Sequence, residues 1–183
     1  DAKGMGNPFH YGFIGDTDTH NAAASNEEYN YTGKFAFEND PRHRLEGVKG
    51  QPAAQVQQVR EFSSGGLAGV WATENTREAI YGAMLRRETF GTTGPQIKVR
   101  FFGGWDYQAT DLQNRNFAWA GYQKGVPMGG DLKGAGKAKS PRFVVQATRD
   151  PQSAPLQKIQ IVKGWVENGE LKSRIFDVVC SDG

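Results

Sequence analysis

The Asn168-Gly169 dipeptide constrains the fold of this chain more than any other short feature. Asn-Gly between two alternating apolar runs is typical of a tight β-hairpin, because both residues readily take the positive φ angles that a two-residue turn requires. The flanking runs predict strands at residues 159–166 and 171–179. Alternation also predicts strands at residues 97–101, 117–122 and 143–148. We therefore expect an antiparallel β-sandwich-like domain over residues 95–183.

The N-terminal half has a different pattern, in which short apolar segments flank one well-marked helix. Residues 11–15 and 66–72 predict buried strands. Asn75, with Glu78 three residues later, has the spacing of a capping box and predicts the start of a helix. The apolar face of that helix comprises Ala79, Ile80, Ala83 and Met84. The strand, helix, strand order predicts β/α units over residues 1–94, with the chemistry at the carboxyl ends of the strands.

Residues 21–65 separate the two predicted strands of this half. They are polar and weakly periodic, apart from a short helix predicted at residues 53–60. Long connections without strong structure are uncommon and often form lids or insertions at functional sites. We expect this segment to be such an insertion.

Composition excludes several classes of function. The net charge of +2 gives no polyanion-binding signature, so nucleic acid is not an expected partner. Cys180 is the only cysteine, which excludes an internal disulfide and a cysteine-based zinc site within the chain. The sequence contains neither a membrane-spanning apolar run nor a signal peptide. Because it begins with Asp1 rather than Met, we expect a fragment or a processed form.

Asp18-Thr19-His20 follows directly after the first predicted strand. Alternate residues of an extended chain share a side, so Asp18 and His20 are predicted to present a carboxylate and an imidazole to one divalent cation. A hydrolytic metal centre needs further His or carboxylate ligands and an open position for water. These 183 residues do not supply the further ligands. On spacing alone, a turn aspartate beside a solvent-exposed histidine is the favoured interpretation, because Asp-x-His is a common tripeptide pattern.

The chain resembles the C-terminal part of a large bacterial family of metal-dependent hydrolases, long filed as a domain of unknown function and related to the polymerase and histidinol phosphatase (PHP) superfamily. The resemblance rests on five segments in the right order, which cover nearly the whole chain. These segments are residues 7–21, 66–80, 86–97, 127–132 and 159–165.

The resemblance implies a distorted PHP-like β/α barrel whose earlier strands lie before residue 1. Asp18 and His20 align with the last Asp-x-His motif of the superfamily, so the resemblance implies that both bind a zinc, manganese or iron ion. The implied reaction is hydrolysis of a small-molecule ester, a phosphoester first, by a metal-activated water, in a periplasmic or exported protein. This sequence departs from the pattern at Asp16, where relatives usually have Ser.

Two other residues, Lys34 and Arg87, are weak candidates for a role at the site. Lys34 lies in the loop after the Asp-x-His motif and is a candidate substrate contact by location, while Arg87 is a candidate for holding a substrate anion. A cation at a helix C-terminus is also favoured without any function, which is the simpler interpretation of Arg87. His10, at the wrong end of the first strand, and His43, in the polar insertion, are expected to be structural.

Two alternatives to a phosphoesterase stay open. The same barrel is compatible with cleavage of an amide or a sulfate ester. Alternatively, the chain is a β-sandwich binding or assembly module. Trp105, Trp119 and Trp165 are predicted to pack in the core, and a sugar-binding platform is the minority alternative. In every case an incomplete barrel exposes an apolar face, so the expected partner is an N-terminal segment of the same protein or a second copy. The 183 residues alone are expected to be inactive.

Overall fold

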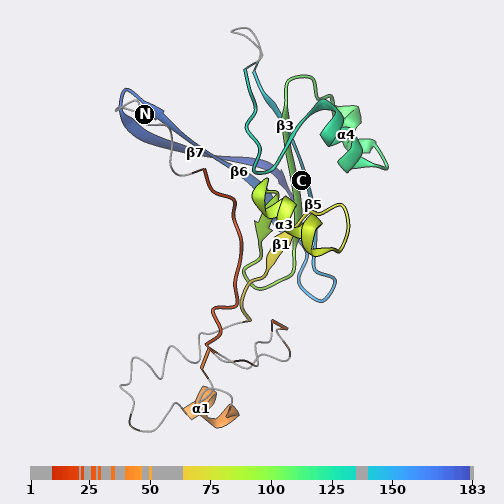
Figure 1. The fold of residues 1–183 in the computed structure, drawn as a ribbon. Coiled ribbons are helices and arrows are strands. Elements are labelled where there is room, and N and C mark those ends of the chain that lie inside the picture. Colours follow the sequence, from red (N-terminus) through yellow and green to blue (C-terminus); the bar gives the residue numbers. More distant parts are fainter. Residues whose placement is uncertain are drawn as a thin grey trace.

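The structure, a computed structural model, describes residues 10–20, 22, 26–27, 29, 34–35, 40–46, 50, 64–134 and 140–181. The fold is mixed α/β, with short helices and three antiparallel sheets (Figure 1). In chain order the elements are α1 (Pro41–Glu46), β1 (Ala68–Val70), α3 (Arg77–Leu85), β2 (Thr89–Gly91), β3 (Lys98–Gly104), η3 (Ala109–Gln113), α4 (Phe117–Lys124), β4 (Gly125–Pro127), β5 (Arg142–Thr148), β6 (Lys158–Glu167) and β7 (Glu170–Cys180).

The first sheet contains β1 and β2, which are joined through α3. The predicted helix is confirmed, and Thr76 rather than Asn75 is its N-cap, because the Thr76 side chain accepts a hydrogen bond from the Ala79 amide. The two strands pair antiparallel, with Gly69 opposite Phe90. The β/α units predicted for this half would have parallel strands, so that prediction is wrong for β1 and β2. A three-residue strand with partly exposed side chains also replaces the longer buried strand predicted at residues 66–72.

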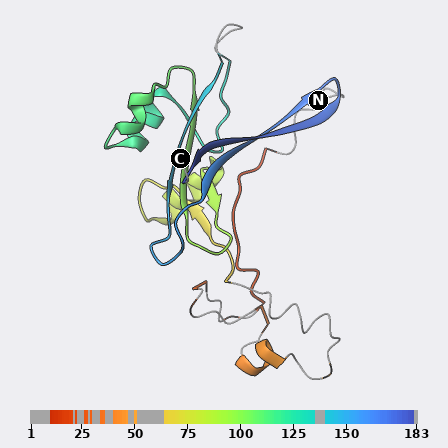
Figure 2. The same cartoon turned by 180° about the vertical axis from the view of Figure 1, so that it is seen from behind.

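Residues 10–20 form no regular secondary structure, so the strand predicted at residues 11–15 is wrong. The segment instead lies against the first sheet around Gly15. A side chain on Gly91 would lie 2.5 Å from the backbone nitrogen of Gly15, and one on Gly15 would lie 2.4 Å from the Thr92 carbonyl oxygen. Glycine at both positions permits this close backbone approach. The segment then leads away toward α1, at the far end of the molecule from the sheets (Figures 1 and 2).

The second sheet has the order β4-β3-β5 and forms the centre of the molecule. Strands predicted at residues 97–101 and 143–148 correspond to β3 and β5, which pair antiparallel along seven residue positions. The strand predicted at residues 117–122 is wrong, because Phe117–Lys124 is the helix α4. Asn116 is its N-cap and accepts a hydrogen bond from the Trp119 amide at 3.1 Å.

The core lies between α4 and the central sheet. Phe102 is 1% exposed, and its ring contacts the rings of Phe117 and Tyr122 edge-on, with centroids 5.7 and 5.1 Å away. Tyr107 closes the core and donates its hydroxyl hydrogen to the Gly121 carbonyl oxygen at 2.6 Å. Edge-on aromatic pairs contribute about 0.5–1.5 kcal/mol each beyond their burial. These contacts hold α4 against β3.

The third sheet is the hairpin β6-β7, as Asn168-Gly169 predicts. Both turn residues have positive φ, at 54° for Asn168 and 82° for Gly169, which is the geometry of the primed hairpin turns. The hairpin extends well beyond the rest of the molecule (Figures 1 and 2). It leaves Val162, Val166, Leu171 and Ile175 exposed by 61–83%.

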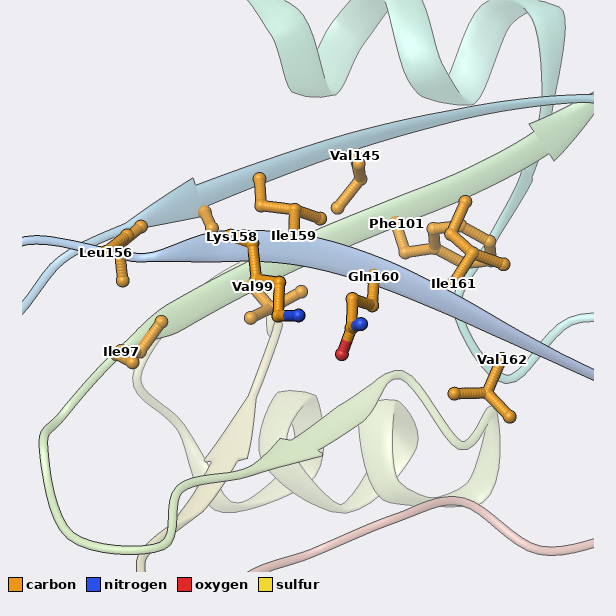
Figure 3. A pocket seen from close by; sticks show the side chains of 11 residues that line it. Ile97, Val99, Phe101, Val145, Leu156, Lys158, Ile159, Gln160, Ile161 and Val162 are labelled. Atoms are coloured by element: carbon orange, nitrogen blue, oxygen red, sulfur yellow. The ribbon is translucent and has the colours of Figure 1, made fainter. Parts of the chain in front are cut away.

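An apolar groove of about 420 Å³ lies where β6 crosses the face of the central sheet. Figure 3 shows Val99 and Phe101 of β3 and Val145 of β5 on one side and Ile159 and Ile161 of β6 on the other. Among its lining residues only Lys158 and Gln160 are polar. The groove is therefore apolar, and its lining contains no histidine or carboxylate that could bind a metal ion.

The described residues contain no closed barrel. Within residues 1–94 they form a two-stranded antiparallel sheet, and not the predicted β/α segment of a barrel. Antiparallel pairing is confirmed in residues 95–181, where helices interrupt the strands. The division at residues 94 and 95 falls in the turn between β2 and β3 and stays a prediction. The helix predicted at residues 53–60 lies outside the described residues. None of the described helices is long and apolar enough to cross a membrane.

Candidate functional site

Asp18 and His20 lie in a hydrogen-bonded turn. The Asp18 amide donates to Asp16 Oδ1 at 3.0 Å, and the Thr19 amide donates to Thr17 Oγ1 at 3.3 Å. Such local bonds stabilise turns in competition with strands. Asp18 has a positive φ of 51°, so the prediction that Asp18 and His20 share one face of an extended strand is wrong. Asp16 stands where Ser was expected, and its carboxylate stabilises this turn by accepting the hydrogen bond from the Asp18 amide.

Two backbone hydrogen bonds fasten this turn to the rest of the chain. The Asp16 carbonyl oxygen accepts from the Gly66 amide at 2.8 Å, two residues before β1. The His20 amide donates to the Lys34 carbonyl oxygen at 2.7 Å. The Asp-x-His turn is therefore held between the edge of the first sheet and the polar insertion.

The His20 ring is oriented by its own turn. Its Nδ1 lies 2.7 Å from the Asp18 carbonyl oxygen, and its centroid lies 5.0 Å from that of Phe35. A carbonyl oxygen only accepts, so this contact assigns the hydrogen of a neutral His20 to Nδ1 and its lone pair to Nε2. Histidine ligands of metals typically have this arrangement, in which a second hydrogen bond fixes the ring and its tautomer.

Lys34 forms an ion pair with Asp18. Lys34 Nζ lies 2.5 Å from Asp18 Oδ2, and the two side chains are 32% and 70% exposed. The hydrogen bond from Lys34 lowers the pKa of Asp18, with a small opposing effect of desolvation and smaller lowering effects of the Lys34 and His20 charges. Asp18 is thus an anion at neutral pH, and a cation already lies against it.

The Asp18 carboxylate and His20 Nε2 are donors of the kinds that zinc, manganese and iron accept. Lys34 places its ammonium at Asp18 Oδ2, where a metal ion would also be attracted. The two donors are of the right kind for a metal site, but Asp18 Oδ1 lies 3.9 Å from His20 Nδ1, so the carboxylate is on the Nδ1 side of the ring and not in front of Nε2. Within the part of the chain that the structure describes, no group of three or more His, Cys, Asp or Glu side chains could hold a metal ion.

Arg87 lies in a separate cluster of charged groups. Its Nη1 lies 3.1 Å from His10 Nδ1, and its Nη2 lies 3.4 Å from Asp131 Oδ2. His10 Nδ1 and Asp131 Oδ1 are 3.5 Å apart. Arg87 has a positive φ of 62° directly after the end of α3. The structure therefore pairs Arg87 with a carboxylate of the chain itself, which competes with any substrate anion.

Sequence reasoning did not identify Asp131 as the partner of Arg87. The two residues are 44 positions apart, and no local pattern connects them. His10, expected to be structural, takes part in this cluster. His43, also expected to be structural, lies in α1, where its amide donates to the Asp40 carbonyl oxygen at 2.9 Å.

The chain is thus a mixed α/β protein that has an Asp-x-His turn at the edge of a small antiparallel sheet. The chain belongs to the family described as "Protein of unknown function (DUF3604)", whose family model matches residues 1–183. No curated protein and no solved structure matches the chain.

Proposed function

We propose that this chain is part of a metal-dependent hydrolase that cleaves a phosphoester of a small molecule. Asp18 and His20 are two of the metal ligands, and the ligands that complete the site lie in sequence upstream of residue 1. The observation that carries the proposal is the 2.7 Å contact between His20 Nδ1 and the Asp18 carbonyl oxygen. It favours the tautomer in which Nε2 offers its lone pair to a cation.

The roles of the residues follow from their contacts. His20 binds through Nε2, with its ring held by the Asp18 carbonyl and by Phe35. Asp18 binds through its carboxylate, which stays ionised because Lys34 lowers its pKa. A bound zinc, manganese or iron ion supplies a water of lowered pKa and polarises the scissile ester. Lys34 stabilises the ionised carboxylate, and a metal ion that bound Asp18 through Oδ2 would have to replace this contact.

Arg87 has no role in this proposal, because Asp131 and His10 already engage its guanidinium. The relation to the PHP superfamily, the barrel formed together with upstream strands and the periplasmic or exported location belong to the same proposal. They are supported by the five ordered segments of the sequence resemblance. Cleavage of an amide or a sulfate ester would use the same two ligands, so only the choice of substrate distinguishes these reactions.

Substrate profiling of the intact protein tests the proposal. Phosphoesters, amides and sulfate esters are assayed with Asp18→Ala and His20→Ala variants, and we expect phosphoester hydrolysis that both substitutions reduce by at least about 100-fold. Asp40→Ala is a matched control, because Asp40 also forms an exposed ion pair, with Arg42 at 3.0 Å. Unchanged activity in both the Asp18 and His20 variants would overturn the ligand assignment. Absence of hydrolysis of all three classes would favour a binding module.

A further inference from the structure

A second cavity, of about 500 Å³, lies where β1, α3, β3 and α4 meet. It is lined by Trp71, Ala72, Thr73, Arg86, Glu88, Arg100, Ala118, Trp119 and Tyr122. Its volume falls within the range of about 300–1,000 Å³ that is usual for small-molecule sites. None of its lining residues belongs to the Asp-x-His turn or to the Arg87 cluster, so a ligand in this cavity would bind independently of the proposed hydrolytic site.

Arg100 provides a cationic group that lacks a full set of acceptors. Its guanidinium carbon lies 3.8 Å from the centre of the Trp71 ring, which fixes its plane against an aromatic face. Trp71 is held in turn, because its Nε1 donates to the Val99 carbonyl oxygen at 2.9 Å. Arg100 Nη1 is buried and has no hydrogen-bond partner among the described residues. A donor without an acceptor is costly, so an acceptor that a ligand brings to the Arg100 guanidinium would stabilise it.

Glu88 is already engaged by Arg86 and Tyr122. Its side chain is 3% exposed, and its Oε2 accepts from Arg86 Nη2 at 3.4 Å. Its Oε1 accepts from the Tyr122 hydroxyl. Burial and the hydrogen bond and charge of Glu88 raise the pKa of Tyr122, against a smaller lowering effect of the charge and hydrogen bond of Arg100, so the hydroxyl stays protonated. The lining therefore contains two guanidinium groups and one carboxylate, a net charge of +1 that favours an anion.

The wall formed by α4 is aromatic and open to solvent. Trp119 is 57% exposed and Tyr122 is 44% exposed, and they are three residues apart on one face of the helix. The prediction that Trp119 packs in the core is therefore wrong. Its indole instead borders a cavity whose other walls carry Arg100, Glu88 and Thr73.

We propose that this cavity binds a sugar ring that carries a carboxylate, such as a uronic acid. The apolar face of the ring stacks on Trp119, the carboxylate pairs with the Arg100 guanidinium, and the sugar hydroxyls bond to the polar groups around Glu88. A sugar matches this lining because it combines a C–H face with several hydroxyl groups. A purely aromatic acid would leave the polar walls without partners, and a neutral sugar would leave the charge of Arg100 uncompensated.

Titration of the intact protein with glucuronate, glucose, acetate and benzoate, followed by ligand-observed NMR, tests this assignment. We expect glucuronate to bind at least about tenfold more tightly than each of the other three. Trp119→Ala is expected to weaken glucuronate binding about tenfold or more, because the ring loses its stacking surface. Trp105→Ala is the control, since Trp105 Nε1 donates to the Lys133 carbonyl oxygen outside this cavity. It should leave glucuronate binding unchanged.

Arg100→Lys tests the role of the guanidinium, because lysine keeps the positive charge but lacks the planar group that binds a carboxylate through two N–H donors. We expect this variant to lose most of the preference for glucuronate over glucose. Trp119 is largely exposed, so its replacement tests the site even where the Arg100 variant folds poorly. Equal affinity for glucuronate and glucose, tighter binding of benzoate, or full binding by the Trp119→Ala variant would each overturn the proposal.

Discussion

Lys34 Nζ lies 2.5 Å from Asp18 Oδ2, although the two residues are 16 positions apart. The same two parts of the chain are joined by the backbone hydrogen bond from His20 to the Lys34 carbonyl, at 2.7 Å. Side-chain and backbone contacts thus hold Lys34 against the Asp-x-His turn. The Asp-x-His turn and the cation that pairs with Asp18 are therefore one structural unit.

Lys34→Gln should raise the pKa of Asp18 toward its ordinary value, because the hydrogen bond from Lys34 is the main cause of its lowering. A lowered folded-state pKa contributes stability above the unfolded-state value, and this stability is lost as the pH falls through the folded-state value. The variant should therefore lose less stability on acidification. Carboxyl-carbon NMR titration measures the pKa directly. Asp40, paired with Arg42, should titrate unchanged, and an unchanged Asp18 would contradict the assigned cause.

Gly121→Ala should destabilise the protein by about 1–3 kcal/mol, because overpacking a core forces its neighbours to move. A Cβ on Gly121 would lie 2.6 Å from the Phe102 ring, which is 1% exposed. Gly82→Ala in α3 is the matched control, since a Cβ there would lie 3.4 Å from the flexible end of the Arg86 side chain. That change should stabilise by about 0.5–1 kcal/mol through helix propensity. Urea unfolding measures both effects, and equal effects of the two changes would argue against the packing of α4 on β3.

Tyr107 should make the folded state sensitive to alkali. Burial raises its pKa to about 12, with a smaller contribution from Asp111. The unfolded chain then releases its proton near the ordinary value of 10.0, so the folded state loses stability as the pH rises from the unfolded-state to the folded-state pKa. Unfolding measured across this range should show a smaller loss in Tyr107→Phe, which has no hydroxyl proton. An equal loss in both proteins would contradict the burial of this hydroxyl.

Local sequence signals predicted the fold where local geometry determines it. Asn168-Gly169 predicted the β6-β7 hairpin because two positive φ angles are needed at that turn. The helix at residues 117–124 was missed because its aromatic residues were taken for a strand. Its buried residues Phe117, Ala120 and Gly121 follow the helical spacing instead, and the Asn116 cap supports it. The antiparallel pairing of β1 with β2 depends on how α3 packs, which no local pattern records.

The candidate site was predicted in its residues and not in its geometry. The Asp18-Thr19-His20 motif drew attention to this turn, but Asp18 takes a left-handed conformation that the strand prediction excluded. Asp16 supports this conformation by accepting a hydrogen bond from the Asp18 amide. Asp in place of Ser at this position was therefore a sequence signal for a turn, and the strand prediction did not use it. The pairing of Lys34 with Asp18 and of Arg87 with Asp131 arises from tertiary contacts alone.

Elemental analysis of the intact protein tests the central claim most directly. We predict zinc, manganese or iron bound to the protein, with a clear loss of metal in both Asp18→Ala and His20→Ala. The controls Asp40→Ala and His43→Ala should keep their metal, because these side chains lie in and before α1 and not in the Asp-x-His turn. A protein without metal, or one that keeps its full metal content in both the Asp18 and the His20 variants, would contradict the account.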